Sequence, residues 1–216
     1  MKRSDRGRPG RSATYRTHVA LGVIVAVVSF GLGVVTDFGQ TWLPESGASV
    51  ANSGGSWVLI GFALALVATS TGMAVLCGGL SLLGLVGGYY ASSGVRGMPE
   101  SLEQIIFWVI AAVVVGPLVG LAAGSVRRGP PLHVGVGVGA LSGVLVGESI
   151  FGLTKNAQST SAGYWWVQIG LAFILVLTID LWRARGRLAK VMSLAAGVIV
   201  AAATYLAYFH PISVRH

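Results

Sequence analysis

Long apolar stretches fill most of the chain, and the polar residues gather between them. Seven stretches approach the length of a membrane-spanning helix, which needs about 20 mostly apolar residues. They cover approximately His18–Asp37, Ser56–Ser70, Thr71–Ser92, Leu102–Val126, His133–Leu153, Tyr164–Trp182 and Ala189–Phe209. The pattern therefore predicts an all-α fold, a polytopic transmembrane bundle of seven helices.

The second and third stretches run together, because no charged residue lies between Ser56 and Ser92. A single helix over that length would be about 55 Å long, at 1.5 Å per residue. The hydrocarbon core of a bilayer is only about 30 Å thick. The polar cluster in this run is Thr69–Gly72, so we expect a tight turn there. One long tilted helix is the alternative.

The composition excludes an ordinary water-soluble domain. Of 216 residues, 54% are hydrophobic and 10% are charged, whereas a soluble domain carries about 25% charged residues. Intrinsic disorder is excluded as well, because it requires low hydrophobicity and high charge. The single cysteine excludes a disulfide framework and a zinc site built from several cysteines.

The positive charges predict how the helices are oriented. With seven spans, 12 of the 15 lysine and arginine residues fall on the side of the N-terminus, and only Arg96, Lys155 and Arg215 fall on the other. Membrane proteins retain positive residues on the cytoplasmic side. We therefore expect the N-terminus inside and the C-terminus outside a bacterial plasma membrane. This topology accounts for the net charge of +8, so the expected partner is the lipid bilayer and not nucleic acid.

The same prediction divides the chain into three segments. Residues 1–17 are expected to form a disordered basic cytoplasmic tail, residues 18–209 the transmembrane domain, and residues 210–216 a short external tail.

Glycines at four-residue spacing mark one face of each of two predicted spans. The fourth span has Gly116, Gly120 and Gly124, and the fifth has Gly135, Gly139, Gly143 and Gly147. Small residues at this spacing let helices in lipid approach closely. Because only a short segment joins the two spans, we expect an antiparallel hairpin packed through the two glycine ridges.

Glu148 is the most deeply placed ionisable residue of the predicted spans. Ionisable groups in the membrane are costly and are candidate functional groups. Two interpretations remain open for Glu148: a functional polar site, or a structural buried carboxylate bonded to a neighbouring helix. Asp37 ends the first span, and a solvated interface residue is the favoured interpretation there.

Aromatic and polar residues map together to the outer half of the bundle. Aromatic walls with a few polar groups are typical of ligand pockets, while an aromatic belt with loop packing is the alternative. The candidate ligand-binding residues are Glu148, Asn52, Trp57, Tyr89, Tyr90, Trp108 and Asp37. The histidines are scattered and no common catalytic motif is present, so neither a metal, a cofactor nor a catalytic residue is predicted.

An ordered set of motifs resembles a known family. The set comprises Ala51–Trp57, Gly88–Tyr90, Phe107–Trp108, Gly116–Gly120 and Glu148. In that order they resemble a family of bacterial integral membrane proteins of unknown function, over roughly residues 18–209. The resemblance implies a membrane fold and no particular activity. The long outer loop and the tight inner turn are more loosely similar to substrate-binding subunits of vitamin importers.

Three classes of function remain open. The first is binding or transport of a small solute through an outer-facing pocket near Glu148. The second is a structural or partner-binding membrane subunit, in contact with another subunit or a second copy of the chain. The third is an intramembrane enzyme, which the scarcity of catalytic polar groups disfavours.

Overall fold

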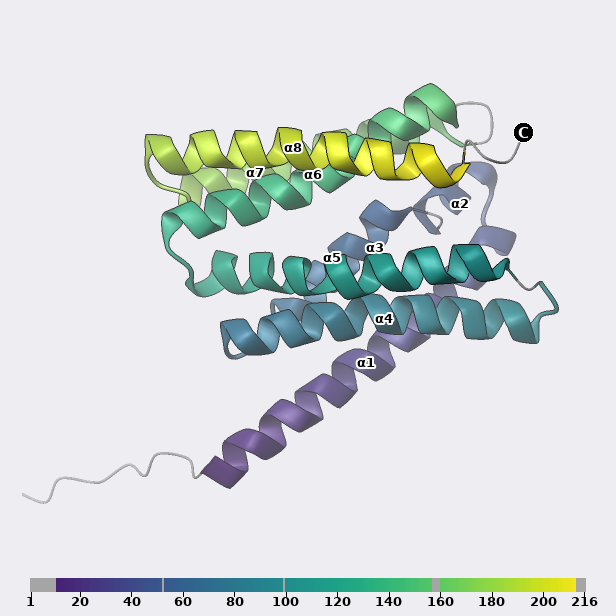
Figure 1. The fold of residues 1–216 in the computed structure, drawn as a ribbon, viewed down its shortest axis with the longest axis horizontal. Coiled ribbons are helices and arrows are strands. Elements are labelled where there is room, and N and C mark those ends of the chain that lie inside the picture. Colours follow the sequence, from purple (N-terminus) through teal and green to yellow (C-terminus); the bar gives the residue numbers. More distant parts are fainter. Residues whose placement is uncertain (1–10, 52, 99, 157–159, 213–216) are drawn as a thin grey trace, which may run out of the picture.

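The computed structural model describes the chain except residues 1–10, 52, 99, 157–159 and 213–216. The described residues form eight helices and no strand (Figure 1). These are α1 (Arg11–Trp42), α2 (Glu45–Ala51), α3 (Gly54–Ala65), α4 (Thr71–Val95), α5 (Leu102–Arg128), α6 (Pro131–Lys155), α7 (Ala162–Trp182) and α8 (Arg187–Ile212).

Six of these helices, all except α2 and α3, are long and apolar enough to cross a membrane. The predicted class, an all-α polytopic bundle, is thereby confirmed. The stretch expected as the second span forms α3, which has 12 residues. Such a helix is about 18 Å long, shorter than a bilayer core of about 30 Å. The count of seven crossings therefore stays a prediction.

The long apolar run folds back close to the expected position. Helix α3 ends at Ala65 and α4 begins at Thr71, so the alternative of one long helix is wrong. Ser70 is the N-cap of α4, and its hydroxyl accepts a hydrogen bond from the Met73 amide at 3.2 Å. The polar cluster thus begins the next apolar helix, because a serine side chain satisfies an amide that has no partner within the helix.

The helix ends form two groups at opposite ends of the bundle. At one end, which we call the basic end, His18 lies 3.2 Å from Thr69, and Arg183 donates to the carbonyl of Arg127. At the other end, Arg96 pairs with Asp37. Helices α1 and α4 therefore both run away from the basic end, and the direction alternates from α4 through α8. The chain returns to the basic end between α1 and α4 through the segment that contains α3. Which end faces the cytoplasm stays a prediction.

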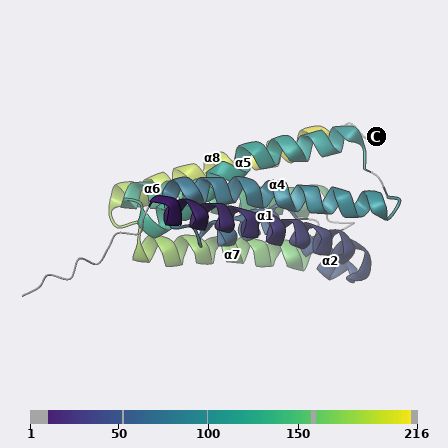
Figure 2. The ribbon, with the colours of Figure 1, turned by 90° about the horizontal axis from the view of Figure 1, so that it is seen from below.

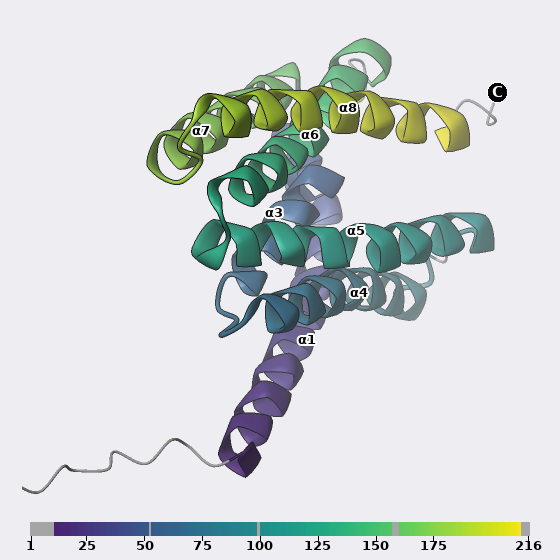
Figure 3. The ribbon, with the colours of Figure 1, turned by 60° about the vertical axis from the view of Figure 1, so that its left-hand side comes forward.

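The helices fall into two groups with α3 between them. Figure 3 shows α1, α4 and α5 on one side and α6, α7 and α8 on the other. Helix α3 contacts α4, α5 and α6. Viewed from below, α7 lies on the side of the bundle away from α5 (Figure 2).

The predicted glycine-packed hairpin of α5 and α6 is wrong. The glycines of α5 lie against α4, where a Cβ on Gly120 would collide with the Ala74 carbonyl. The ridge on α6 lies against α8 instead, and a Cβ on Gly139 would collide with the Ser193 carbonyl. Four-residue spacing specifies a helix face but not the helix that covers it. Helices α5 and α6 do touch, through Gly137 and Ala122.

Helices α6 and α8 pack in parallel along a series of small residues. From the basic end upward, the glycines of α6 face small residues of α8 in the pairs Gly135–Ala189, Gly139–Ser193, Gly143–Gly197 and Gly147–Ala201. Helices α1 and α4 also run in parallel and meet closely, at Gly84 beside Ser29 and at Gly88 beside Phe30.

The expected outer boundaries of the domain differ from the helix ends. Helix α1 already begins at Arg11, so part of the segment expected as a disordered tail is helical. Helix α8 continues to Ile212. Residues 1–10 and 213–216 lie outside the described part of the chain.

Candidate functional site

The N-terminus of α3 is buried within the bundle. Ser53 is its N-cap, and Gly54 and Gly55 are its first residues. A Cβ on Gly55 would lie 2.6 Å from a carboxylate oxygen of Glu148, and one on Gly54 would collide with the Tyr208 hydroxyl. A side chain at either position would have to displace the Glu148 or Tyr208 side chain, so glycine allows both to approach the helix terminus.

The carboxylate of Glu148 occupies this helix terminus. The Gly54 amide donates to Oε1 at 2.8 Å, and the Gly55 amide and the Ser53 hydroxyl each donate to Oε2 at 2.7 Å. The first amides of a helix have no partner within the helix and carry a partial positive charge, so they favour an anion. Glu148, which is 2% exposed, supplies that anion from α6.

Two further side chains complete what we call the Glu148 network, which comprises Ser53, Gly54, Gly55, Glu148, Gln168 and Tyr208. Gln168 of α7 donates to Oε2 at 3.0 Å, and Tyr208 of α8 donates to Oε1 at 3.0 Å. All five partners are donors, which suits a carboxylate because it only accepts. The network joins α3 to all three helices of the second group.

The other end of α3 is held by positive side chains. Arg127 donates to the carbonyls of Leu66 and Ala68, and Arg128 also donates to Ala68. The last carbonyls of a helix carry a partial negative charge. Helix α3 is thus a short helix with a buried carboxylate at its N-terminus and two exposed arginine side chains bonded just beyond its C-terminus.

A small pocket opens above the N-terminus of α3. Its cavity volume is only about 30 Å³, and the space around it is partly open to the outside. We call it the aromatic pocket, and it is lined by Gln40, Ser53, Gly54, Trp57, Tyr89, Tyr90, Gln104 and Trp108. Ser53 and Gly54 belong both to this lining and to the Glu148 network, so the carboxylate lies directly behind the wall of the pocket.

The rings of the aromatic pocket form a continuous series. The ring centroid of Trp57 lies 5.8 Å from that of Tyr89 and 6.0 Å from that of Trp108. Tyr89 meets Tyr90 edge to face at 5.1 Å, and its hydroxyl donates to Gln40 at 3.1 Å. The indole nitrogen of Trp57 is buried and has no acceptor among the described residues.

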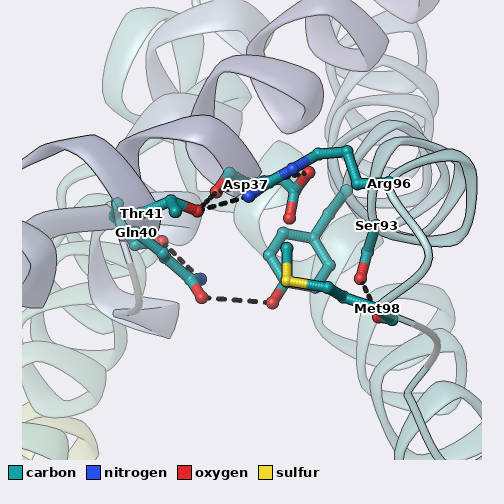
Figure 4. A network of polar contacts seen from close by, with 8 residues as sticks. Asp37, Gln40, Thr41, Ser93, Arg96 and Met98 are labelled. Carbon is teal, nitrogen blue, oxygen red and sulfur yellow. Dashed lines mark hydrogen bonds and ion pairs between the residues drawn. The ribbon is translucent and has the colours of Figure 1, made fainter.

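Asp37 lies apart from the pocket lining, in a network between α1 and α4 (Figure 4). It is 4% exposed and pairs with Arg96 at 2.9 Å, so the solvated interpretation is wrong. Arg96 also donates to Thr41 at 2.6 Å, and its guanidinium lies 4.8 Å from the ring centroid of Phe38. A buried carboxylate needs such a partner, and the signal in the sequence was the isolated Arg96 at the end of the third stretch.

The structure brings four of the seven predicted site residues into one pocket: Trp57, Tyr89, Tyr90 and Trp108. Glu148 lies behind its wall, Asp37 is placed elsewhere, and Asn52 lies outside the described residues. Sequence reasoning missed Gln40, Gln104, Gln168 and Tyr208. Gln168 and Gln104 could have been found as the two amide side chains within the predicted apolar spans.

Comparisons with known proteins place the chain in a family but assign no activity. Neither the search of curated proteins nor the search of solved structures gave a match. The loose similarity to vitamin-importer subunits therefore stays a prediction. A family model does match residues 12–213, which is most of the chain, and so the protein belongs to a family of unknown function, DUF6518.

Proposed function

We propose that this protein binds a small solute in the aromatic pocket as part of its transport across the plasma membrane. The observation that carries the proposal is the pocket itself, which combines four aromatic rings, two amide side chains and a buried helix terminus. Ligand sites are typically concave and aromatic, with a few polar groups that orient the ligand.

Two further features support a binding role. The Trp57 indole donor lacks an acceptor among the described residues, and a buried donor without an acceptor costs free energy. A solute with an oxygen acceptor would satisfy this donor once the Trp57 ring turns its nitrogen toward the pocket. In addition, transporters commonly bind substrates beside helices that are interrupted within the membrane, and α3 is such a short helix next to the pocket.

Thermal unfolding in detergent tests the proposal. A library of small solutes is added to the purified protein and to two variants, Trp108→Leu in the pocket and Trp182→Leu at the basic end. Trp182 is 79% exposed and provides the matched control. We expect at least one solute to raise the Tm of the wild type and of Trp182→Leu but not of Trp108→Leu. If every stabilising solute acts equally on Trp108→Leu, the pocket is not the binding site.

The second candidate is a structural or partner-binding membrane subunit. The observation that favours it is the completeness of the Glu148 network, in which five donors from this chain satisfy the carboxylate. Such a network can hold α3 in place without any solute. Native purification that recovers a stoichiometric partner, together with no stabilising solute, would favour this function over the first.

A further inference from the structure

We propose that the solute bound in the aromatic pocket is a small organic cation that carries a substituted ammonium group. This inference rests on the proposed function and specifies its ligand chemistry. It is argued from the rings that line the pocket and from the charges placed around it.

The lining of the pocket is rich in the groups that attract cations. Tryptophan and tyrosine faces carry a partial negative charge, and a cation within about 6 Å of the ring centroid is attracted to it. Trp57, Tyr89, Tyr90 and Trp108 are all half-buried, so part of each ring is accessible from the pocket. The remaining polar lining side chains, Gln40, Ser53 and Gln104, are uncharged.

The charges of the described residues that act on the pocket are mostly negative, and the one cation among them, Arg96, is paired with Asp37. Glu148 accepts hydrogen bonds from two lining residues, Ser53 and Gly54. Glu100 lies close enough to interact electrostatically with Tyr89 and Tyr90, and Glu103 precedes the lining residue Gln104. Opposite charge at the mouth of a pocket raises the local concentration of a charged ligand.

The positive charges at the same end do not line the pocket among the described residues. Arg96 is held by Asp37 and Thr41, and Lys155 ends α6. Elsewhere in the chain, Arg96 over Phe38 is already a cation held against an aromatic ring. An anionic solute would meet the carboxylates and no lining cation, so the arrangement favours a cation.

Binding of two solutes of the same shape tests the inference. Choline carries a trimethylammonium group, and 3,3-dimethyl-1-butanol replaces its nitrogen with carbon and has no charge. The dissociation constant of each is measured on the full chain in lipid nanodiscs, by calorimetry and by tryptophan fluorescence. We expect choline to bind at least about tenfold more tightly, since ring faces attract the charge.

Ring variants locate the site of binding. Trp108→Leu should weaken choline binding by about tenfold, whereas Trp108→Phe, which keeps a ring, should weaken it less. Trp182→Leu, at the basic end, should leave it unchanged. Because the wild type is compared with two ligands, the test remains decisive even if one ring variant does not fold.

The outcomes separate this inference from the function on which it rests. If the neutral alcohol binds as tightly as choline, or if only neutral solutes stabilise the wild type, the cation inference is overturned and the proposed function stands. If choline binds but Trp108→Leu and Trp108→Phe bind it unchanged, the inference is overturned as well. If no solute of any charge acts through Trp108, the proposed function fails.

Discussion

The carboxylate of Glu148 accepts a hydrogen bond from the backbone amide of Gly55 at 2.7 Å, across 93 residues of sequence. Gly55 lies in the first turn of the short helix α3, and Glu148 lies near the end of α6. One side chain therefore satisfies a helix terminus in the first half of the chain from within the second half. This contact joins the two helix groups through α3.

Replacing Glu148 with glutamine should destabilise the fold. The five groups around the carboxylate are all donors, and a glutamine would direct its own donor nitrogen against some of them. Buried donors left unpaired cost about 1–3 kcal/mol each, so we expect a loss of about 2–4 kcal/mol in the free energy of unfolding. Equilibrium unfolding in mixed detergent micelles measures it.

Glu103→Gln is the matched control for this substitution. Glu103 is exposed in the first turn of α5, and its loss should change the stability by less than about 1 kcal/mol. Equal stability of Glu148→Gln and Glu103→Gln would mean that the Glu148 network does not hold α3 in place.

Alanine at Gly139 should weaken the contact between α6 and α8. Its Cβ would collide with the Ser193 carbonyl, and overpacking of this kind costs about 1–3 kcal/mol. Alanine at Gly170 of α7, where a Cβ meets nothing within 4 Å, should instead stabilise by up to about 1 kcal/mol, because alanine has the higher helix propensity. Opposite changes in the unfolding free energy are the expected result, and a loss of similar size in both variants would contradict the packing.

These glycines show where prediction from sequence reaches its limit. The apolar stretches predict the long helices because the length of a bilayer sets the length of a span, and the cluster Thr69–Gly72 predicts the fold-back because polar groups must leave the apolar run. The spacing of the glycines predicts a close contact, which is present. The partner helix was missed because only one of the four small residues on the facing side of α8, Gly197, is a glycine, although Ala189, Ser193, Gly197 and Ala201 keep the same four-residue spacing.

One part of the candidate site could likewise be predicted from the sequence, and another part could not. The aromatic residues could be placed at one end from the topology alone, since each lies at the outer end of its predicted span. The hydrogen bonds of Glu148 could not be predicted, because its partners include the backbone amides of Gly54 and Gly55. A backbone amide has no signal in the sequence, so the buried start of α3 emerges only from the three-dimensional arrangement.

Replacing Arg96 with lysine should lower the stability of the fold. The Arg96 guanidinium uses two nitrogens to contact Asp37 and Thr41 and lies over Phe38, whereas a lysine has one nitrogen and no planar group. We expect Arg96→Lys to lower the unfolding free energy by about 1 kcal/mol. Arg185→Lys, at an exposed position of the basic end, is the control. If both variants unfold alike, the network of Figure 4 contributes no stability that depends on the guanidinium.

The direction of the chain through the membrane can be tested by cysteine labelling. Cys77, which is buried, is first replaced with alanine, and single cysteines are then placed at Val67 and Lys155. Val67 is 53% exposed between α3 and α4, at the basic end, whereas Lys155 ends α6 at the opposite end. Because positive residues are retained in the cytoplasm, an impermeant maleimide should label Lys155→Cys in intact cells. It should label Val67→Cys only after permeabilisation.

The pattern of labelling tests the orientation together with the crossings of α4, α5 and α6, because these three helices lie between Val67 and Lys155. If Val67→Cys were labelled in intact cells and Lys155→Cys were not, the protein would be inverted while these three crossings stood. If both were labelled in intact cells, the two ends of the bundle would share one side, and α4, α5 and α6 could not all cross the membrane. Helix α3 precedes Val67 in the chain and is too short to cross alone, so its N-terminus needs the preceding segment to bring it within the membrane.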